Sequence, residues 1–282
     1  MEQSPTYDSV LADALDLMRG WINVVRAVVQ DVASIAEKTP SASSKDKAVS
    51  RWQVFLGSLL VDVAEGVSNL AEVGNVRSMV MLERSMYEYQ QKAQYFSSHK
   101  NEAFEQIASI GARKYLALTK MAHPNPRVGV ALAAEYLNWK RTAGERDEWS
   151  GQKRQLTMHL ANADPSKIKQ DKNGTKYTEE FQTAYGIPSL YVHGEPIMMA
   201  EVFKDLTDDT TLQMREQFRF FDTLTATNAA CTIMSNFCVQ TTKAYNLGIE
   251  RIYALRPQVA RVINSSAAVH GTGLTVTIPQ TP

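Results

Sequence analysis

The stretch VLADALDLMRGWINVVRAVVQDVASI, residues 10–35, decides the fold class of this chain. Its apolar residues recur three or four positions apart, the spacing that places side chains on one face of an α-helix. Ser4 and Pro5 precede it as a typical N-cap and first helical position, and Thr39-Pro40 follows it as a stop. The pattern predicts one long helix in an N-terminal unit, residues 1–40, that packs on the rest of the protein.

The same helical period continues through most of the chain. A second pattern begins near Lys47, is interrupted at Gly74-Asn75 and resumes through Val76–Phe96. Further helices are predicted over residues 101–121, 127–149, 151–162, 197–206 and 210–246. Strands and helices do not alternate, so a nucleotide-binding sheet is not expected. We predict an all-α fold, a multi-helix bundle of long antiparallel helices.

Two segments depart from the helical pattern. Residues 164–175, DPSKIKQDKNGT, predict a lysine-bearing loop with an Asn-Gly turn. The segment GLTVTIP, residues 273–279, is the only one with the composition of a strand. We therefore predict a helical bundle domain over residues 47–262 and a short extended C-terminal tail over residues 263–282.

Composition and charge bear on the partners and the cellular location of the protein. The 282 residues include 30 basic and 30 acidic side chains, so no overall field attracts nucleic acid or an anionic membrane. Glu2 and Asp8 stand where a signal peptide needs positive charge. The longest apolar run, VFLGSLLV at residues 54–61, is too short to span a bilayer. These features predict a cytoplasmic protein without membrane contact.

The two cysteines are predicted to be reduced and buried. Cys231 and Cys238 are seven residues apart in a helical segment, which separates their Cα atoms by roughly 10 Å at 1.5 Å per residue. A disulfide needs Cα atoms within about 7 Å. Neither cysteine has a CxxC or histidine partner nearby, and the usual phosphate-binding, dinucleotide-binding and metalloprotease motifs are absent. No cofactor and no metal are therefore expected.

Arg154 and His159, in the segment RQLTMH, have the Arg-x-x-x-x-His spacing of HEPN ribonucleases, which belong to a class of nucleotide-binding helical domains. In such enzymes the arginine stabilises phosphate charge and the histidine acts on the ribose hydroxyl, as metal-independent RNA cleavage requires. The same spacing arises readily by chance in a chain with this many arginines. A solvent-facing basic helix is the interpretation that we favour.

A second candidate site combines two short patterns. Arg84 and Glu88 are four apart on one predicted helix, where they form a surface ion pair or, if buried, fix a neighbouring helix. His193 precedes Gly194 and Pro196, which end a local helix. We expect His193 to be at least half buried, with Glu88 or Tyr191 as its polar neighbour. A structural contact is the favoured role, and a catalytic role is the alternative.

Three features together resemble an uncharacterised bacterial family of all-helical proteins that is distantly HEPN-like. These features are LERSMYEY (82–89), DEWSG (147–151), and the Tyr-x-x-x-Ser-x-x-x-His-Gly motif that runs from Tyr185 to Gly194. The resemblance covers about residues 50–245 and implies an HEPN-like helical core. It also implies that the Arg84–Glu88 helix faces the helix of the Tyr-Ser-His motif.

Three functions remain open from the sequence. The first is an interaction or scaffold protein of a bacterial defence or stress system, which binds a protein partner or a second copy through its long helices. The second is an HEPN-like ribonuclease that acts on RNA, with His193, Arg84, Glu88 and Tyr191 or with Arg154 and His159 as its site. The third is a small-molecule sensor with a pocket between helices.

Overall fold

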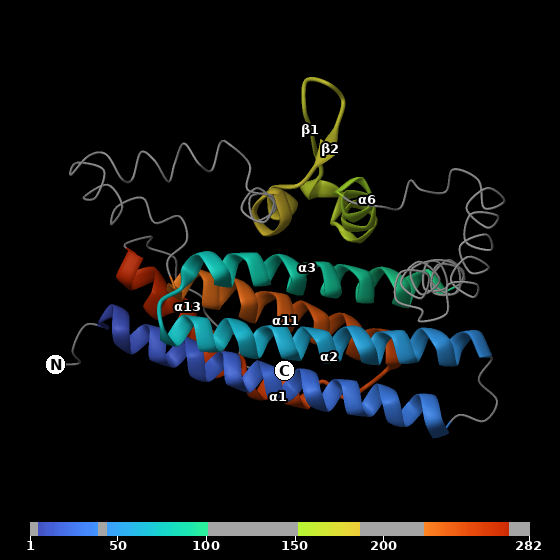
Figure 1. Ribbon diagram of the computed structural model, residues 1–282, viewed down its shortest axis with the longest axis horizontal. Helices are drawn as coiled ribbons and strands as arrows, with labels where there is room; N and C mark the ends of the chain where they lie inside the picture. The colour runs from blue at the N-terminus through green and yellow to red at the C-terminus, as the bar shows by residue number, and fades with distance from the viewer. Residues whose placement is uncertain (1–4, 39–43, 101–151, 187–222, 271–282) are drawn as a thin grey trace, which may run out of the picture.

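The computed structural model describes residues 5–38, 44–100, 152–186 and 223–270 (Figure 1). Within these ranges the chain is helical almost throughout, and the sheet that they contain has only two short strands. The predicted all-α, multi-helix bundle is therefore confirmed.

Four long helices lie side by side and form the main bundle (Figure 1). They are α1 (Tyr7–Lys38), α2 (Ser44–Glu72), α3 (Val76–Ser98) and α11 (Thr223–Tyr245). The short helix α12 (Glu250–Ala254) leads into α13 (Arg256–His270), which packs against α1. Residues from the two ends of the sequence therefore build one core.

Local sequence sets the ends of the helices. Thr6 and Ser9 exchange backbone-to-side-chain hydrogen bonds of 3.1 and 3.3 Å and so cap α1, two residues after the predicted cap. Between α2 and α3, Gly74 has a φ of +69°, which favours glycine. The Asn75 side chain then accepts the N–H of Ser78 and caps α3, so the predicted interruption at Gly74-Asn75 is a tight turn between antiparallel helices.

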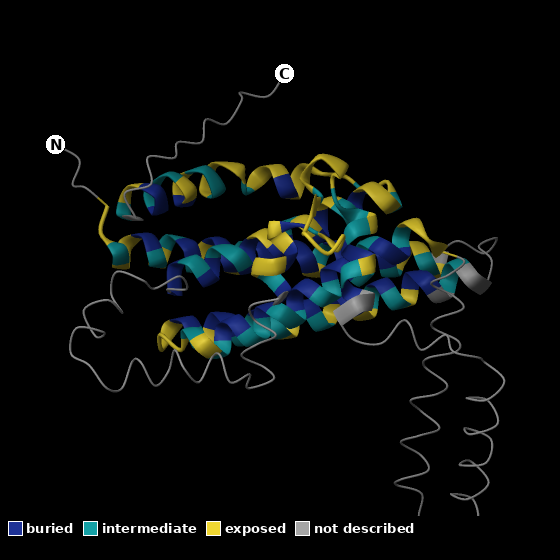
Figure 2. Cartoon of the chain, turned by 90° about the horizontal axis from the view of Figure 1, so that it is seen from above, coloured by how far each residue is buried: buried dark blue, intermediate teal, exposed yellow. Residues whose placement is uncertain are grey.

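The core is built from the faces that the helical period predicts, and buried positions follow stripes along the helices (Figure 2). Each of the four bundle helices contributes a fully buried methionine or leucine, such as Met18, Leu60, Met86 and Met234. These side chains are packed inside a single continuous apolar cluster. Burial of one such side chain stabilises the fold by roughly 1.5–3 kcal/mol.

Helices α1, α2 and α11 approach closely at Gly57. A Cβ atom at this position would lie 2.3 Å from Cγ2 of Val29 and 2.9 Å from Cζ of Phe237. Alanine normally stabilises a helix interior relative to glycine by about 1 kcal/mol. We expect Gly57→Ala instead to lower the free energy of unfolding by about 1–3 kcal/mol, because the core is overpacked.

The measurement is urea denaturation of Gly57→Ala and of Gly66→Ala, which serves as the control. Comparison of the two separates the effect of core packing on stability from the effect of helix propensity. A Cβ at Gly66 would meet only the terminal Cδ1 of Leu82 at 3.2 Å, and this methyl group can move. Gly66→Ala is therefore expected to be close to neutral or stabilising. Equal stabilisation by both substitutions would contradict the close approach at Gly57.

Two boundaries differ from the prediction. The predicted extended tail, residues 263–282, is wrong for residues 263–270, because α13 continues to His270. Val262, Ser266 and Ala267 are buried and continue the packed face of this helix. The predicted loop at residues 164–175 contains a short hairpin, in which β1 (Lys169–Gln170) pairs antiparallel with β2 (Lys176–Tyr177). The strand predicted at residues 273–279 lies outside the described residues.

One segment within the described ranges, Val49–Glu72 of α2, is long and apolar enough to cross a membrane by length and composition alone. This segment packs against α1, α3 and α11. Leu60, Ala64 and Val67 on it are completely buried among those helices. Its surroundings in the structure are those of a core helix of the bundle.

Both cysteines lie in the interior on α11. Cys231 and Cys238 are free thiols, as predicted. Burial raises the pKa of both, that of Cys238 to about 12, and the nearby Glu83 raises the pKa of Cys231 further. Both side chains therefore serve as small apolar core residues.

Candidate functional site

A second layer, which we call the α6–η3 layer, lies on α3 outside the main bundle (Figure 1). It comprises residues 152–186. Its helical elements are α6 (Gln152–Asn162), η2 (Pro165–Lys167), α7 (Glu179–Phe181) and η3 (Gln182–Gly186), and the β1–β2 hairpin stands between η2 and α7. Polar and aromatic side chains fill the interface between this layer and α3.

His159 lies at the centre of this interface and is 1% exposed. Its Nδ1 shares a hydrogen bond with the hydroxyl of Tyr87 on α3, and its Nε2 shares one with the hydroxyl of Thr178. Burial lowers the pKa of His159 to about 4, so the imidazole is neutral at pH 7. The predicted solvent-facing position is wrong for His159, because partners distant in sequence satisfy both ring nitrogens.

Thr178 connects the hairpin to α7 and to His159. It follows β2 directly, and its Oγ1 accepts the N–H of Phe181 at 3.1 Å as the N-cap of α7. The ring of Phe181 lies 5.3 Å from the ring of His159 and 5.0 Å from the ring of Tyr185. A continuous series of ring contacts, tilted between His159 and Phe181 and stacked between Phe181 and Tyr185, therefore runs from α6 to η3.

Arg84 and Glu88 link α3 to the end of the α6–η3 layer. Their side chains are 17% and 20% exposed and form an ion pair of 3.3 Å. Arg84 Nη2 also donates to the hydroxyl of Tyr185 at 3.1 Å, and its guanidinium carbon lies 4.8 Å from the centre of that ring. The pair therefore fixes a neighbouring element, which is the role that the sequence predicts for a buried pair.

Amide side chains extend the same interface along α6. Gln155 Nε2 donates to Glu88 Oε2 at 3.4 Å. Asn162 Nδ2 donates to the carbonyl of Gln91 at 3.3 Å and to its side-chain oxygen at 2.9 Å. Together with the bond of His159, these hydrogen bonds hold α6 to α3 along about two turns.

The sequence analysis gives two alternative candidate sites, and the structure places residues from both of them in one interface. Arg84, Glu88 and His159 all belong to the interface between α3 and the α6–η3 layer. His193 and Tyr191 lie outside the described residues, and so does the side chain of Arg154. The predicted contact between His193 and the Arg84–Glu88 helix therefore stays a prediction.

Glu83 is a buried acid that the sequence analysis misses. It is 6% exposed, and its Oε1 has no hydrogen-bond partner. Burial raises the pKa of Glu83 to about 8, so the carboxyl is mostly protonated at pH 7. A signal exists in the sequence, since Glu83 stands four residues after Met79 and three before Met86, on the face of α3 that enters the core.

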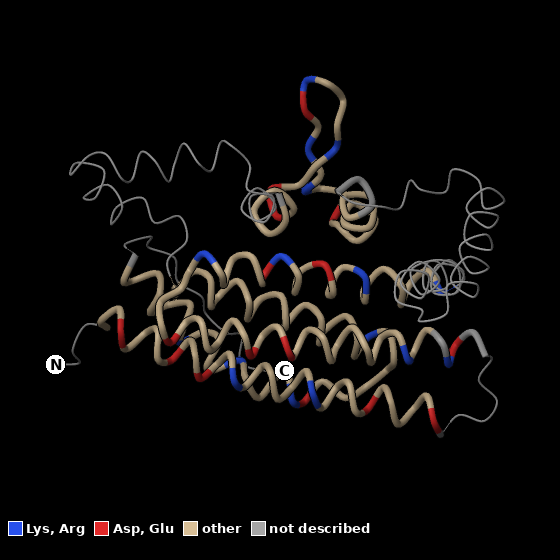
Figure 3. Tube along the Cα trace, viewed as in Figure 1, with Lys and Arg blue, Asp and Glu red and all other residues tan. Residues whose placement is uncertain are grey.

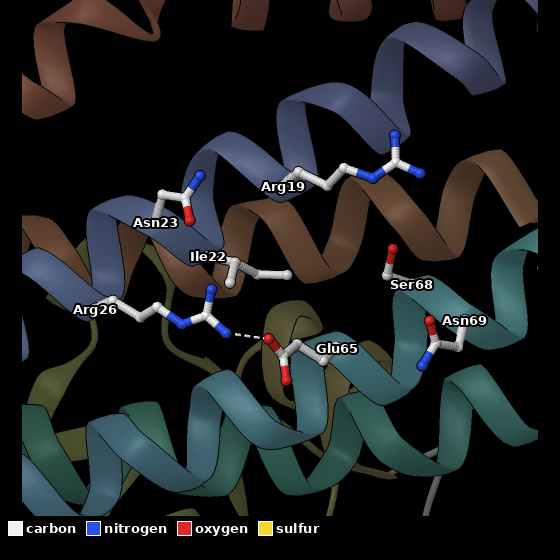
Figure 4. A pocket seen from close by; sticks show the side chains of 7 residues that line it. All are labelled: Arg19, Ile22, Asn23, Arg26, Glu65, Ser68 and Asn69. Atoms are coloured by element: carbon white, nitrogen blue, oxygen red, sulfur yellow. Dashed lines mark hydrogen bonds and ion pairs between the residues drawn. The ribbon is translucent and has the colours of Figure 1, made fainter.

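A shallow depression lies between α1 and α2, on a different part of the molecule (Figure 4). Its volume is about 420 Å³. Its lining is mostly polar and consists of Arg19, Ile22, Asn23 and Arg26 from α1 with Glu65, Ser68 and Asn69 from α2. Ion pairs join Arg26 to Glu65 and Arg19 to Glu72. Small-molecule sites are usually lined mainly by apolar side chains, and this lining differs because it is mostly charged or polar.

The interface between α3 and the α6–η3 layer supplies hydrogen bonds, ion pairs and stacked rings between elements of one chain. Within the described ranges, no group of three or more His, Cys, Asp or Glu residues could hold a metal ion. Of the candidate residues that the structure places here, Arg84 and Glu88 contact each other, and His159 contacts Tyr87, Thr178 and Phe181. No family model, curated protein or solved structure matches this chain.

Proposed function

We propose that this protein is a helical interaction or scaffold protein, in which the interface between α3 and the α6–η3 layer has a structural role. The observation that supports this proposal is the state of His159. Its imidazole is neutral and buried, and both ring nitrogens are occupied by Tyr87 and Thr178. A general base needs access to the substrate and a pKa near the operating pH, and His159 has neither.

The setting that we propose is the bacterial cytoplasm, in a defence or stress system. This part of the proposal is supported by the family resemblance and by the balance of 30 basic and 30 acidic residues. A protein partner or a second copy of the chain binds through the long helices, as bundles commonly allow.

The metal-independent ribonuclease is the second candidate. The observation in its favour is Arg84, whose Nε is buried without a hydrogen-bond partner beside Tyr185 and Glu88. A guanidinium with spare donors is the group that stabilises phosphate charge in RNA cleavage. The resemblance adds His193 to this cluster as the base.

Incubation of the purified chain with labelled single-stranded RNA in the presence of EDTA separates the two candidates. We expect the RNA to stay intact, because His159 is inaccessible and serves as a link between helices. Cleavage that disappears in His193→Ala and persists in His99→Ala would overturn the scaffold proposal and establish the ribonuclease.

A further inference from the structure

The hairpin of the α6–η3 layer concentrates positive charge on a neutral protein. Between Pro165 and Tyr177 there are four lysines and one acidic residue, and Asp164, Glu179 and Glu180 flank this segment. Lys169 pairs with Glu179 at the base of the hairpin. The other three, Lys167, Lys172 and Lys176, are exposed and form no ion pair within 4 Å in the part of the chain that the structure describes. The hydrogen bonds from Ser166, helped by the charge of Lys167, nevertheless lower the pKa of the neighbouring Asp164.

The single acid of the hairpin is occupied by the turn itself. The carboxylate of Asp171 accepts the backbone N–H groups of Asn173 at 2.8 Å and Thr175 at 2.9 Å. Gly174 has a φ of +81°, and its N–H donates to the carbonyl of Asp171 at 3.0 Å. These bonds fix the tip of the hairpin, which lowers the entropy that would be lost on binding a partner.

The base of the hairpin is tied to the bundle. The two strands pair Lys169 with Tyr177 and Gln170 with Lys176. Thr178 then follows and bonds to the buried His159. The hairpin projects from this anchor away from the main bundle, with basic positions along it (Figures 1 and 3).

We propose that this hairpin, residues 165–177, binds the phosphate backbone of a nucleic acid. The inference goes beyond the proposed function, because it assigns a nucleic-acid partner to a surface other than the long helices. Lysine ammonium groups act as strongly hydrated point charges, which suit phosphates spaced along a strand.

The side chains of the hairpin do not suit a protein partner. Protein interfaces are depleted in lysine and depend on buried aromatic or arginine anchors. The hairpin has no exposed large apolar side chain and no arginine, since Ile168 and Tyr177 are partly buried. The hairpin therefore offers charged side chains without an apolar anchor. This combination is typical of proteins that bind the phosphate backbone of a nucleic acid independently of its sequence.

The test measures the affinity of the full chain for a labelled single-stranded RNA of about 20 nucleotides by fluorescence anisotropy, at about 50 and 200 mM salt. We expect wild-type binding to weaken as salt rises. The triple variant K167Q/K172Q/K176Q should lose affinity by about tenfold or more at the lower salt. Its slope of log affinity against log salt should fall by about two, because three phosphate contacts are removed.

The variant R51Q/R77Q/K243Q is the matched control. It removes three exposed cations from α2, α3 and α11 and so changes the net charge equally. Its affinity should stay within about twofold of wild type. Equal losses in both variants, or no loss in the hairpin variant, would overturn the proposal. Binding of poly-glutamate in place of RNA, abolished in the hairpin variant, would also overturn it, in favour of an acidic protein partner.

The same RNA distinguishes this inference from the proposed function. RNA that is bound through the hairpin and also cut would leave the inference standing and overturn the scaffold proposal. RNA that is neither bound nor cut would overturn the inference and leave the scaffold proposal standing.

Discussion

Replacing Glu83 by glutamine should stabilise the protein by about 4 kcal/mol more at pH 8 than at pH 4.5. The folded state raises the pKa of this carboxyl from 4.5 to about 8, because burial disfavours its charge. As the pH rises from 4.5 to 8, the unfolded chain releases the proton while the folded protein retains it. The free energy of unfolding of the wild type therefore falls over this window, and glutamine removes that loss.

The measurement is urea denaturation of wild type and Glu83→Gln at several pH values between 4.5 and 8. At pH 4.5 the protonated carboxyl and the amide have similar shape and no charge, so the two proteins should have similar stability. Glu37→Gln, which changes an exposed glutamate of α1, is the control. A difference between wild type and Glu83→Gln that stays constant with pH would mean that folding does not raise the pKa of Glu83.

Replacing His159 by alanine should lower the free energy of unfolding by about 3 kcal/mol or more at pH 7. The substitution leaves a cavity beside Phe181 and removes the hydrogen-bond partner of the hydroxyls of Tyr87 and Thr178. His159→Gln should recover part of the loss, because an amide can satisfy one of the two hydroxyls. His99→Ala, at the exposed end of α3, is the control and should cost less than about 1 kcal/mol.

The pH dependence gives His159 a second signature. The folded state lowers its pKa from 6.5 to about 4. Between pH 6.5 and pH 4 the unfolded chain is therefore protonated at this histidine while the folded protein is not. As the pH drops through that range, the contribution of His159 to the free energy of unfolding falls by about 3 kcal/mol. His159→Gln should lack this component. If the free energy of unfolding of the variant fell between pH 6.5 and pH 4 as much as that of the wild type, His159 would not be buried as described.

Most of the fold follows from local sequence. The helical period and the stop at Thr39-Pro40 predict α1, and Gly74-Asn75 marks the turn before α3, since these signals depend on neighbouring residues only. The end of α13 could not be predicted in the same way. Ser265 and Ser266 interrupt the apolar pattern, and the burial of Ser266 comes from packing with other helices.

The candidate site is predicted only in part, for a physical reason. The spacing of Arg84 and Glu88 indicates a pair, and the resemblance indicates Tyr185 as a residue facing them, which the structure brings together. The burial of His159 depends on Tyr87 and Thr178, which approach it only after α6 has packed on α3. A glutamate is almost always exposed, so Glu83 stands out only when its spacing from two core methionines is considered.

Helix α1 depends on partners from the far end of the chain. It packs against α2, α11 and α13, and the hydroxyl of Tyr7 accepts the N–H of Leu224 at 3.2 Å. About 185 residues separate the end of α1 from the start of α11. A ribosome adds roughly 5–20 residues per second, so the apolar face of α1 waits roughly 10–40 s during synthesis before α11 covers it. Over that interval α2, which packs on α1 and is synthesised directly after it, is the neighbour that can cover this face.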